Sequence, residues 1–137
     1  MIASGLNKYR DVGLLIIRVG LGIAFIAHGW PKVAAGPHGE HGWQEIGQAL
    51  PIPPAVFWGF IGAITEFGGG ILLIVGFAFR PVCMLLFAEM MVALSVHLRS
   101  PNPMMSSFGM YSHALEVGIV FLGLIFLGPG KFSVDRE

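Results

Sequence analysis

Three glutamates and one arginine each stand alone inside a long apolar run of this chain. Glu66, Glu89 and Glu116 occupy three different runs, and Arg18 occupies a fourth. A charged side chain in the hydrocarbon of a bilayer costs on the order of 3 kcal/mol. Side chains kept there are expected to face one another, or a bound ligand, inside a helical bundle. These four residues therefore predict a buried polar cluster, which is the candidate functional site.

The apolar runs dominate the composition. Of 137 residues, 55% are hydrophobic and 12% are charged, and the mean hydropathy is +0.76. Soluble domains carry roughly 25% charged residues. The formal net charge is zero, which gives no indication of a nucleic-acid partner. Cys83 is the single cysteine, so an intramolecular disulfide and CxxC thiol chemistry are excluded. The composition indicates one integral membrane domain with the lipid bilayer around it.

Four apolar runs are long enough to cross a bilayer, for which a helix needs ~20 residues. Prolines lie near the ends of these runs, where they end or begin helices. We predict an all-α fold, an integral membrane antiparallel four-helix bundle formed by residues 1–137 as one domain. The predicted spans are approximately 12–29, 55–79, 82–98 and 110–127.

The basic residues predict the orientation of the bundle. An even number of spans places both termini on one side of the membrane. Five basic residues fall on that side, and two, Lys32 and Arg99, fall on the other. By the positive-inside rule, both termini are expected in the cytoplasm. The five are Lys8, Arg10, Arg80, Lys131 and Arg136.

Depth in the predicted spans suggests which charges meet. With a helical rise of ~1.5 Å per residue, Arg18 and Glu89 fall about 9–10 Å above the starts of their spans. We therefore expect Arg18 to contact Glu66, Glu89 or both. One arginine cannot neutralise three carboxylates. The remaining negative charge would be compensated by a proton, a cation or a cofactor.

Three histidines fall near the predicted outer boundary. Each alone is typical of a side chain that reaches the interface. Together they predict a cavity that opens towards the outer leaflet, bounded by Glu66, His97, His113 and Glu116. A solid bundle is the alternative. The full set of ligand-binding candidates is Arg18, His28, Lys32, Glu66, Glu89, His97, His113 and Glu116.

Metal and haem sites are weaker alternatives. A metal could use His113-x-x-Glu116 with Glu66 and Glu89. The di-iron bundle pattern needs a Glu-x-x-His pair on two helices, and here it occurs once in reversed order. A haem could use two of the three histidines as axial ligands. Neither pattern is specific, and no metal site is predicted.

The order of these motifs resembles the DoxX family of small bacterial and archaeal membrane proteins. The resemblance covers nearly the whole chain. It implies a four-helix bundle in the plasma membrane, and its name comes from a subunit associated with quinone-linked sulfur oxidation. Many members carry the general label of oxidoreductase. The matching stretches are Arg18-x3-Gly22-x2-Phe25-x2-His28-Gly29-x2-Lys32, Glu66-x2-Gly69-Gly70-x-Leu72-Leu73-x2-Gly76-Phe77-x2-Arg80, Glu116, and the ending Gly128-Pro129-Gly130-Lys131-Phe132-Ser133-Val134-Asp135.

Three classes of function remain open. The first is a redox-associated subunit that binds a quinone or another small lipophilic molecule beside Arg18 and the glutamates, with the electron carrier on a soluble or membrane partner. The second is a proton-coupled transporter or channel, for which a homodimer is expected. The third is a non-catalytic scaffold for soluble redox partners. Whether the chain itself is catalytic stays open.

Overall fold

Four long helices build the structure, a computed structural model that describes residues 4–135. Each has the length and hydropathy of a membrane span, and no strand occurs in the described part. Helices suit this setting because a spanning segment must satisfy its backbone groups internally. The elements are a 3-10 helix (Ser4–Tyr9), α1 (Arg10–Ala35), the short α2 (Trp43–Gly47), α3 (Ala55–Val75), α4 (Phe79–Arg99) and α5 (Phe108–Leu127). The chain is an all-helical integral membrane bundle, as predicted.

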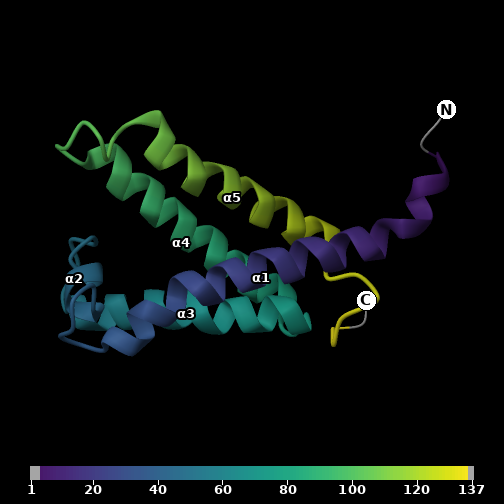
Figure 1. The fold of residues 1–137 in the computed structure, drawn as a ribbon, viewed down its shortest axis with the longest axis horizontal. Helices are drawn as coiled ribbons and strands as arrows, with labels where there is room; N and C mark the ends of the chain where they lie inside the picture. Colours follow the sequence, from purple (N-terminus) through teal and green to yellow (C-terminus); the bar gives the residue numbers. More distant parts are fainter. Residues whose placement is uncertain (1–3, 136–137) are drawn as a thin grey trace.

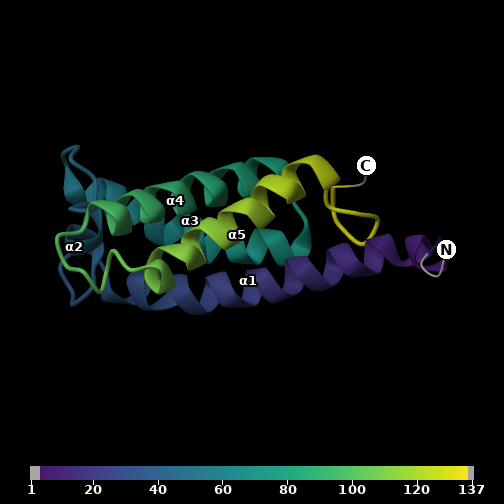
Figure 2. The same cartoon turned by 90° about the horizontal axis from the view of Figure 1, so that it is seen from above.

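The long helices run antiparallel and form two pairs. Helix α1 packs mainly against α3, and α4 packs mainly against α5 (Figure 1). The pairs lie close together at the end that holds residues 4 and 135, here called the terminal end (Figures 1 and 2). They diverge towards the end that holds α2 and residues 100–107, here called the loop end. The bundle is therefore tight at one end and open at the other.

Glycines bring α1 and α3 into close contact. A Cβ added at Gly22 would lie 2.6 Å from the carbonyl oxygen of Gly70, and one at Gly70 would lie 2.7 Å from that of Gly22. A Cβ at Gly29 would lie 2.5 Å from the backbone nitrogen of Phe67. Small residues allow such approach between membrane helices. This pairing fixes the position of α3, which carries half of the candidate site.

The terminal half of the bundle has a packed apolar core. Leu73, Phe79, Leu86 and Phe121 are fully buried there. The ring of Phe121 on α5 meets the ring of Phe25 on α1 edge to face, with centroids 5.2 Å apart. The core closes the terminal half between the two helix pairs.

Two helix boundaries differ from the prediction by at least four residues. Helix α1 continues through Pro31 to Ala35, because membrane helices tolerate an internal proline. Helix α3 ends at Val75, before the predicted boundary, because Gly76 adopts a left-handed conformation at φ 69°. Arg136, which contributes to the predicted charge asymmetry, lies outside the described residues.

Candidate functional site

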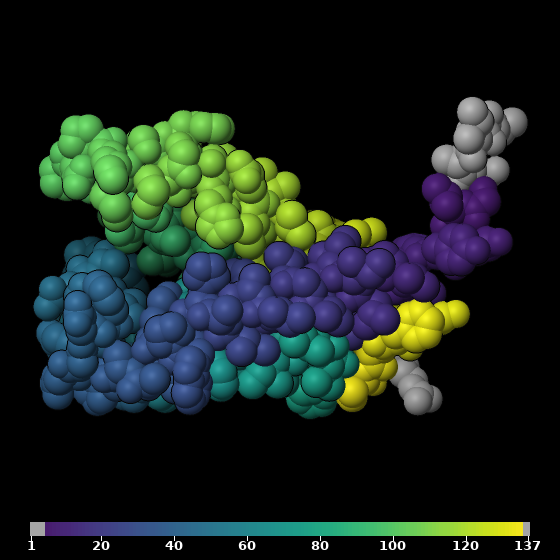
Figure 3. Space-filling model, in the orientation of Figure 1, coloured from purple at the N-terminus to yellow at the C-terminus, as the bar shows by residue number. Residues whose placement is uncertain are grey.

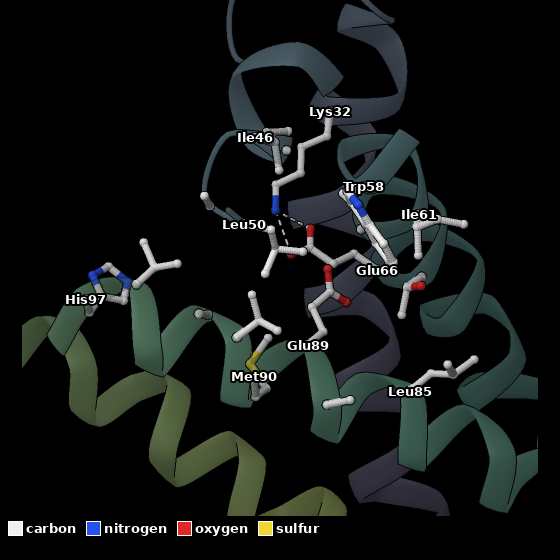
Figure 4. Close-up of a pocket in the computed structure, with 18 residues that line it drawn as sticks. Lys32, Ile46, Leu50, Trp58, Ile61, Glu66, Leu85, Glu89, Met90 and His97 are labelled. Carbon is white, nitrogen blue, oxygen red and sulfur yellow. Dashed lines mark hydrogen bonds and ion pairs between the residues drawn. The ribbon is translucent and has the colours of Figure 1, made fainter. Parts of the chain in front are cut away.

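A cavity of about 380 Å³ lies at the loop end, between α3 and α4 and beneath α2 (Figure 4). Its volume is within the range of small-molecule sites, roughly 300–1,000 Å³. Figure 3 shows the surface hollowed between α4 and the α1–α2 region. Most of the wall is apolar, and a few polar side chains point inward, as is usual in ligand sites. The apolar wall includes Ile46, Leu50, Ile61, Leu85, Met90 and Val92.

Four-residue spacing on two helices places the polar side chains in the cavity. Trp58, Gly62 and Glu66 succeed one another on one face of α3, and Glu89 and His97 share a face of α4. A Cβ at Gly62 would lie 3.3 Å from Oε1 of Glu89. The absent side chain therefore leaves room for the Glu89 carboxylate, which is directed towards that of Glu66 in Figure 4.

Lys32 neutralises one of these carboxylates. Its Nζ donates to both Oε1 and Oε2 of Glu66, at 2.6 Å each. The side chain of Glu66 is 9% exposed and that of Lys32 is 30% exposed. The lysine side chain thus extends from the loop end into the cavity. Its backbone is held by Trp43, whose Nε1 donates to the carbonyl oxygen of Lys32 at 3.1 Å.

Three buried polar atoms of the site have no hydrogen-bond partner among residues 4–135. They are Nε1 of Trp58, Oε2 of Glu89 and Nδ1 of His97, and all three residues line the same cavity. Unsatisfied buried polar groups are rare in native structures, and each one asks for a physical reason. The cavity therefore contains hydrogen-bonding groups that the described chain does not use.

The predicted contact of Arg18 with Glu66 or Glu89 is wrong. The guanidinium, 1% exposed, donates instead to four backbone carbonyls. Nε donates to Leu73 at 3.0 Å, and Nη2 donates to Ile74 at 2.9 Å. Nη1 donates to Pro129 at 2.6 Å, and Nη2 also donates to Phe132 at 2.9 Å. Arg18 lies level with the last turn of α3, about two helical turns from Glu66.

The four acceptors explain why arginine suits this position. Leu73 and Ile74 lie at the C-terminus of α3, where carbonyls lack helical partners and the helix dipole favours a cation. A Cβ at Gly76 would lie 2.9 Å from Cζ of Arg18, so the glycine also admits the guanidinium. We call Arg18 and its four carbonyl acceptors the arginine clasp.

The segment after α5 completes the terminal end. The backbone nitrogens of Val134 and Asp135 donate to the carbonyls of Val75 and Gly76 at 3.2 and 2.9 Å. The Asp135 carboxylate accepts from the backbone nitrogen of Phe79, the first residue of α4, at 2.7 Å. This segment therefore ties the α3–α4 connection to the arginine clasp.

The predicted boundary of the cavity is half wrong. Glu66 and His97 line it, whereas His113 and Glu116 are exposed on α5 and lie outside its lining. His28, also exposed, faces His113 across α1 and α5, with ring centroids 6.5 Å apart. Depth alone placed the four groups together, but α5 turns His113 and Glu116 away from α3. Among residues 4–135, no three His, Cys, Asp or Glu side chains gather as a metal site would require.

The sequence-based depths place Glu89 at the level of Arg18, and Trp58 is not among the predicted candidates, yet both line the cavity. The signal that could have found Trp58 is its four-residue spacing from Gly62 and Glu66, because side chains four residues apart lie on one helix face.

The sequence is similar to those of two inner membrane proteins. Inner membrane protein YqjF of Escherichia coli (strain K12) is 30% identical over 135 residues, covering 96% of this chain and 95% of that protein. Inner membrane protein YphA of the same strain is 29% identical over 135 residues, covering 93% of this chain and 91% of that protein. No solved structure matches the chain. The DoxX family profile matches residues 13–98, a region that contains every residue of the cavity. The chain belongs to the DoxX family.

Proposed function

We propose that this protein binds, in the cavity between α3 and α4, a small lipophilic molecule with a quinone-like polar ring, as the membrane-embedded subunit of a redox assembly. The observation that carries the proposal is the group of three unpartnered polar atoms, on Trp58, Glu89 and His97, in one largely apolar cavity. An apolar body with a few hydrogen-bonding atoms matches that lining.

Each polar group has a role in such a complex. The indole nitrogen of Trp58 only donates, so it suits a ring carbonyl. The Glu89 carboxyl accepts from a ring hydroxyl when ionised and donates to a carbonyl when protonated. Lys32 lies beside the same space, held by Glu66. The set serves both a quinone and its quinol.

Reduction of a quinone to a quinol takes two electrons and two protons. Glu89 and His97 are the groups that would transfer protons to the ring oxygens. The chain has one cysteine, Cys83, which is fully buried outside the cavity lining. The electrons are therefore assigned to a carrier on a partner protein, and this chain binds and protonates the ring.

Binding of a tailless benzoquinone to the detergent-purified protein, measured by calorimetry, tests the proposal. Trp58→Phe keeps an aromatic side chain and removes the indole N–H donor together with the five-membered ring. Loss of one hydrogen bond to a buried partner is worth ~1–3 kcal/mol, so affinity should fall about 5- to 100-fold. Glu89→Gln should also weaken binding. Glu116→Gln is the matched control, because Glu116 is exposed on α5 outside the cavity.

Equal affinities in all four proteins would contradict the proposal, and so would no binding to the wild type. In that case a scaffold role becomes the better interpretation. Mass spectrometry of gently purified protein gives an independent readout, because a retained ligand should be lost from Trp58→Phe and kept in Glu116→Gln.

A proton-conducting pathway has less support. The polar groups of the cavity lie in the loop half, while the described interior of the terminal half is filled by Leu73, Phe79, Leu86 and Phe121. The Arg18 guanidinium in that half donates hydrogen bonds to backbone carbonyls. A relay needs polar groups along the whole path.

The orientation of the site in the membrane is part of the proposal. The excess of basic residues at the terminal end supports a cytoplasmic terminal end, with the cavity in the opposite half. A cysteine replacing His41 should react with an impermeant thiol reagent added to intact cells, and one replacing Lys131 should be protected. Native Cys83 is 0% exposed and gives little background. The reverse labelling pattern would invert the orientation.

A further inference from the structure

A second hollow lies next to the cavity along the bundle. This hollow, about 180 Å³ in volume, lies between α3 and α4 on the terminal side of the cavity. Thr65 and Leu85 line both spaces, so the two are adjacent along the same pair of helices. From Gly62 in the cavity to Leu72 in the hollow, α3 advances about 15 Å. We call the second hollow the α3–α4 groove.

The α3–α4 groove is apolar and open to the side. Apart from Thr65, its lining is hydrocarbon or glycine, including Leu72 and Val82. Ile64 and Leu85 at its edge are 42% and 57% exposed. Since α3 and α4 are membrane spans, this opening faces the acyl chains of the bilayer.

Gly68 is the feature that sets this groove apart from ordinary helix packing. Glycines in membrane helices usually allow a neighbouring helix to approach, as Gly22 and Gly70 do between α1 and α3. A Cβ added at Gly68 would meet only Cγ2 of Ile64, at 3.9 Å. The bare backbone at Gly68 therefore forms part of a groove that no other part of the described chain fills.

We propose that the α3–α4 groove holds the hydrocarbon tail of the molecule whose polar ring lies in the cavity. The ligand class is then a bilayer-resident amphiphile, an oxygen-bearing ring with an aliphatic or prenyl chain, which enters sideways between α3 and α4. This inference rests on the proposed function. It adds that the ligand has a tail and that the tail runs along Gly68 towards the terminal half.

The test compares two ligands that share one ring, a tailless benzoquinone and the same ring with a decyl chain. Both are titrated into wild type and into Gly68→Leu in the same detergent. The leucine would occupy the path of the tail, at a distance from the ring. The decyl ligand should lose about tenfold in affinity, the loss expected when a filled site must accommodate an extra side chain. The tailless ligand should bind both proteins equally.

For each ligand, the ratio of its affinity for wild type to its affinity for Gly68→Leu is calculated, and the two ratios are compared. Partitioning into the micelle cancels in each ratio, because the ligand partitions equally in the two titrations. Gly123→Leu is the matched control: Gly123 is also a glycine within a span, with nothing within 4 Å of an added Cβ, but it lies on α5. It should change neither affinity. Gly68→Ala, a smaller addition, should produce a smaller loss in the same direction and serves if the leucine variant fails to fold.

The outcomes separate the two proposals. Unchanged affinity of the decyl ligand in Gly68→Leu and Gly68→Ala, with the tailless ligand still sensitive to Trp58→Phe, would overturn the groove and leave the cavity intact. Absence of binding of either ligand to wild type would overturn both. A loss shared equally by the two ligands would show that the leucine disturbs the cavity rather than the tail path, and would also overturn the groove.

Discussion

Arg18 and Glu89 both place an ionisable group in the apolar interior, at different levels of the bundle. They differ in the hydrogen-bond partners that the chain provides. Arg18 donates to four backbone carbonyls in the arginine clasp. Glu89 keeps one buried oxygen without a partner among the described residues, in a cavity that Trp58 and His97, each with an unpartnered atom, also line. The clasp is complete within the chain, whereas the cavity has hydrogen-bonding capacity left over. The first arrangement is typical of structural support and the second of a binding site.

The contrast has an energetic side. An unsatisfied buried polar group destabilises a folded protein by ~1–3 kcal/mol. Three such atoms in one cavity lower the stability of the bundle without any structural benefit. Sites that break the rules of packing and hydrogen bonding are commonly functional ones. Variants of the clasp should therefore change stability, and variants of the cavity should change binding.

Arg18→Leu should have the largest effect on stability. It removes the donors of four carbonyls at the terminal end, and each buried acceptor left without a donor costs ~1–3 kcal/mol. The midpoint of thermal unfolding in detergent should fall steeply, with Arg18→Lys intermediate because an ammonium lacks the planar fork. Arg99→Leu, at the exposed end of α4, is the control. A melting temperature near that of wild type would remove the distinction between clasp and cavity.

Lys32→Met should have an intermediate effect. It leaves the Glu66 carboxylate, 9% exposed, without its ammonium partner. Because Lys32 is partly exposed, we expect a loss of about 2 kcal/mol rather than the full cost of a buried pair. Adding Glu66→Gln should recover part of it, and denaturant unfolding of the four proteins of this double-mutant cycle measures the coupling. Strict additivity would mean that the pair contributes little.

Glu89→Gln should have the smallest effect on stability. Its Oε2 has no partner to lose among the described residues, so the free energy of unfolding without ligand should stay within about 1 kcal/mol of wild type or rise slightly. The increase in melting temperature on adding a tailless benzoquinone should shrink. A destabilisation as large as that of Lys32→Met would instead place Glu89 among the structural residues.

Much of the fold could be read from the sequence, because hydropathy and span length are strong signals in a chain with so few charges. The partner of Arg18 could not. The prediction considered side chains only, whereas the acceptors are carbonyls freed by the end of α3 and by the turns at Pro129 and Phe132. Backbone acceptors are present at every residue and leave no mark on composition.

The candidate site was predicted in part. Glu66, Glu89 and His97 were among the predicted ligand-binding candidates, and all three line the cavity. His113 and Glu116 were misplaced because depth along a helix says nothing of its rotation. The divergence of the two helix pairs, which opens the cavity, depends on tertiary packing and has no sequence signal of its own (Figure 1).

The arginine clasp also fixes the order in which the chain can finish assembling. Phe132, the last of its acceptors, lies 114 residues after Arg18. At a synthesis rate of ~5–20 residues per second, the guanidinium waits about 6–20 s for that carbonyl. Until Pro129 and Phe132 have been synthesised, only two of the four acceptors, the carbonyls of Leu73 and Ile74, are available to Arg18. Completion of the arginine clasp therefore depends on residues that are added after α5.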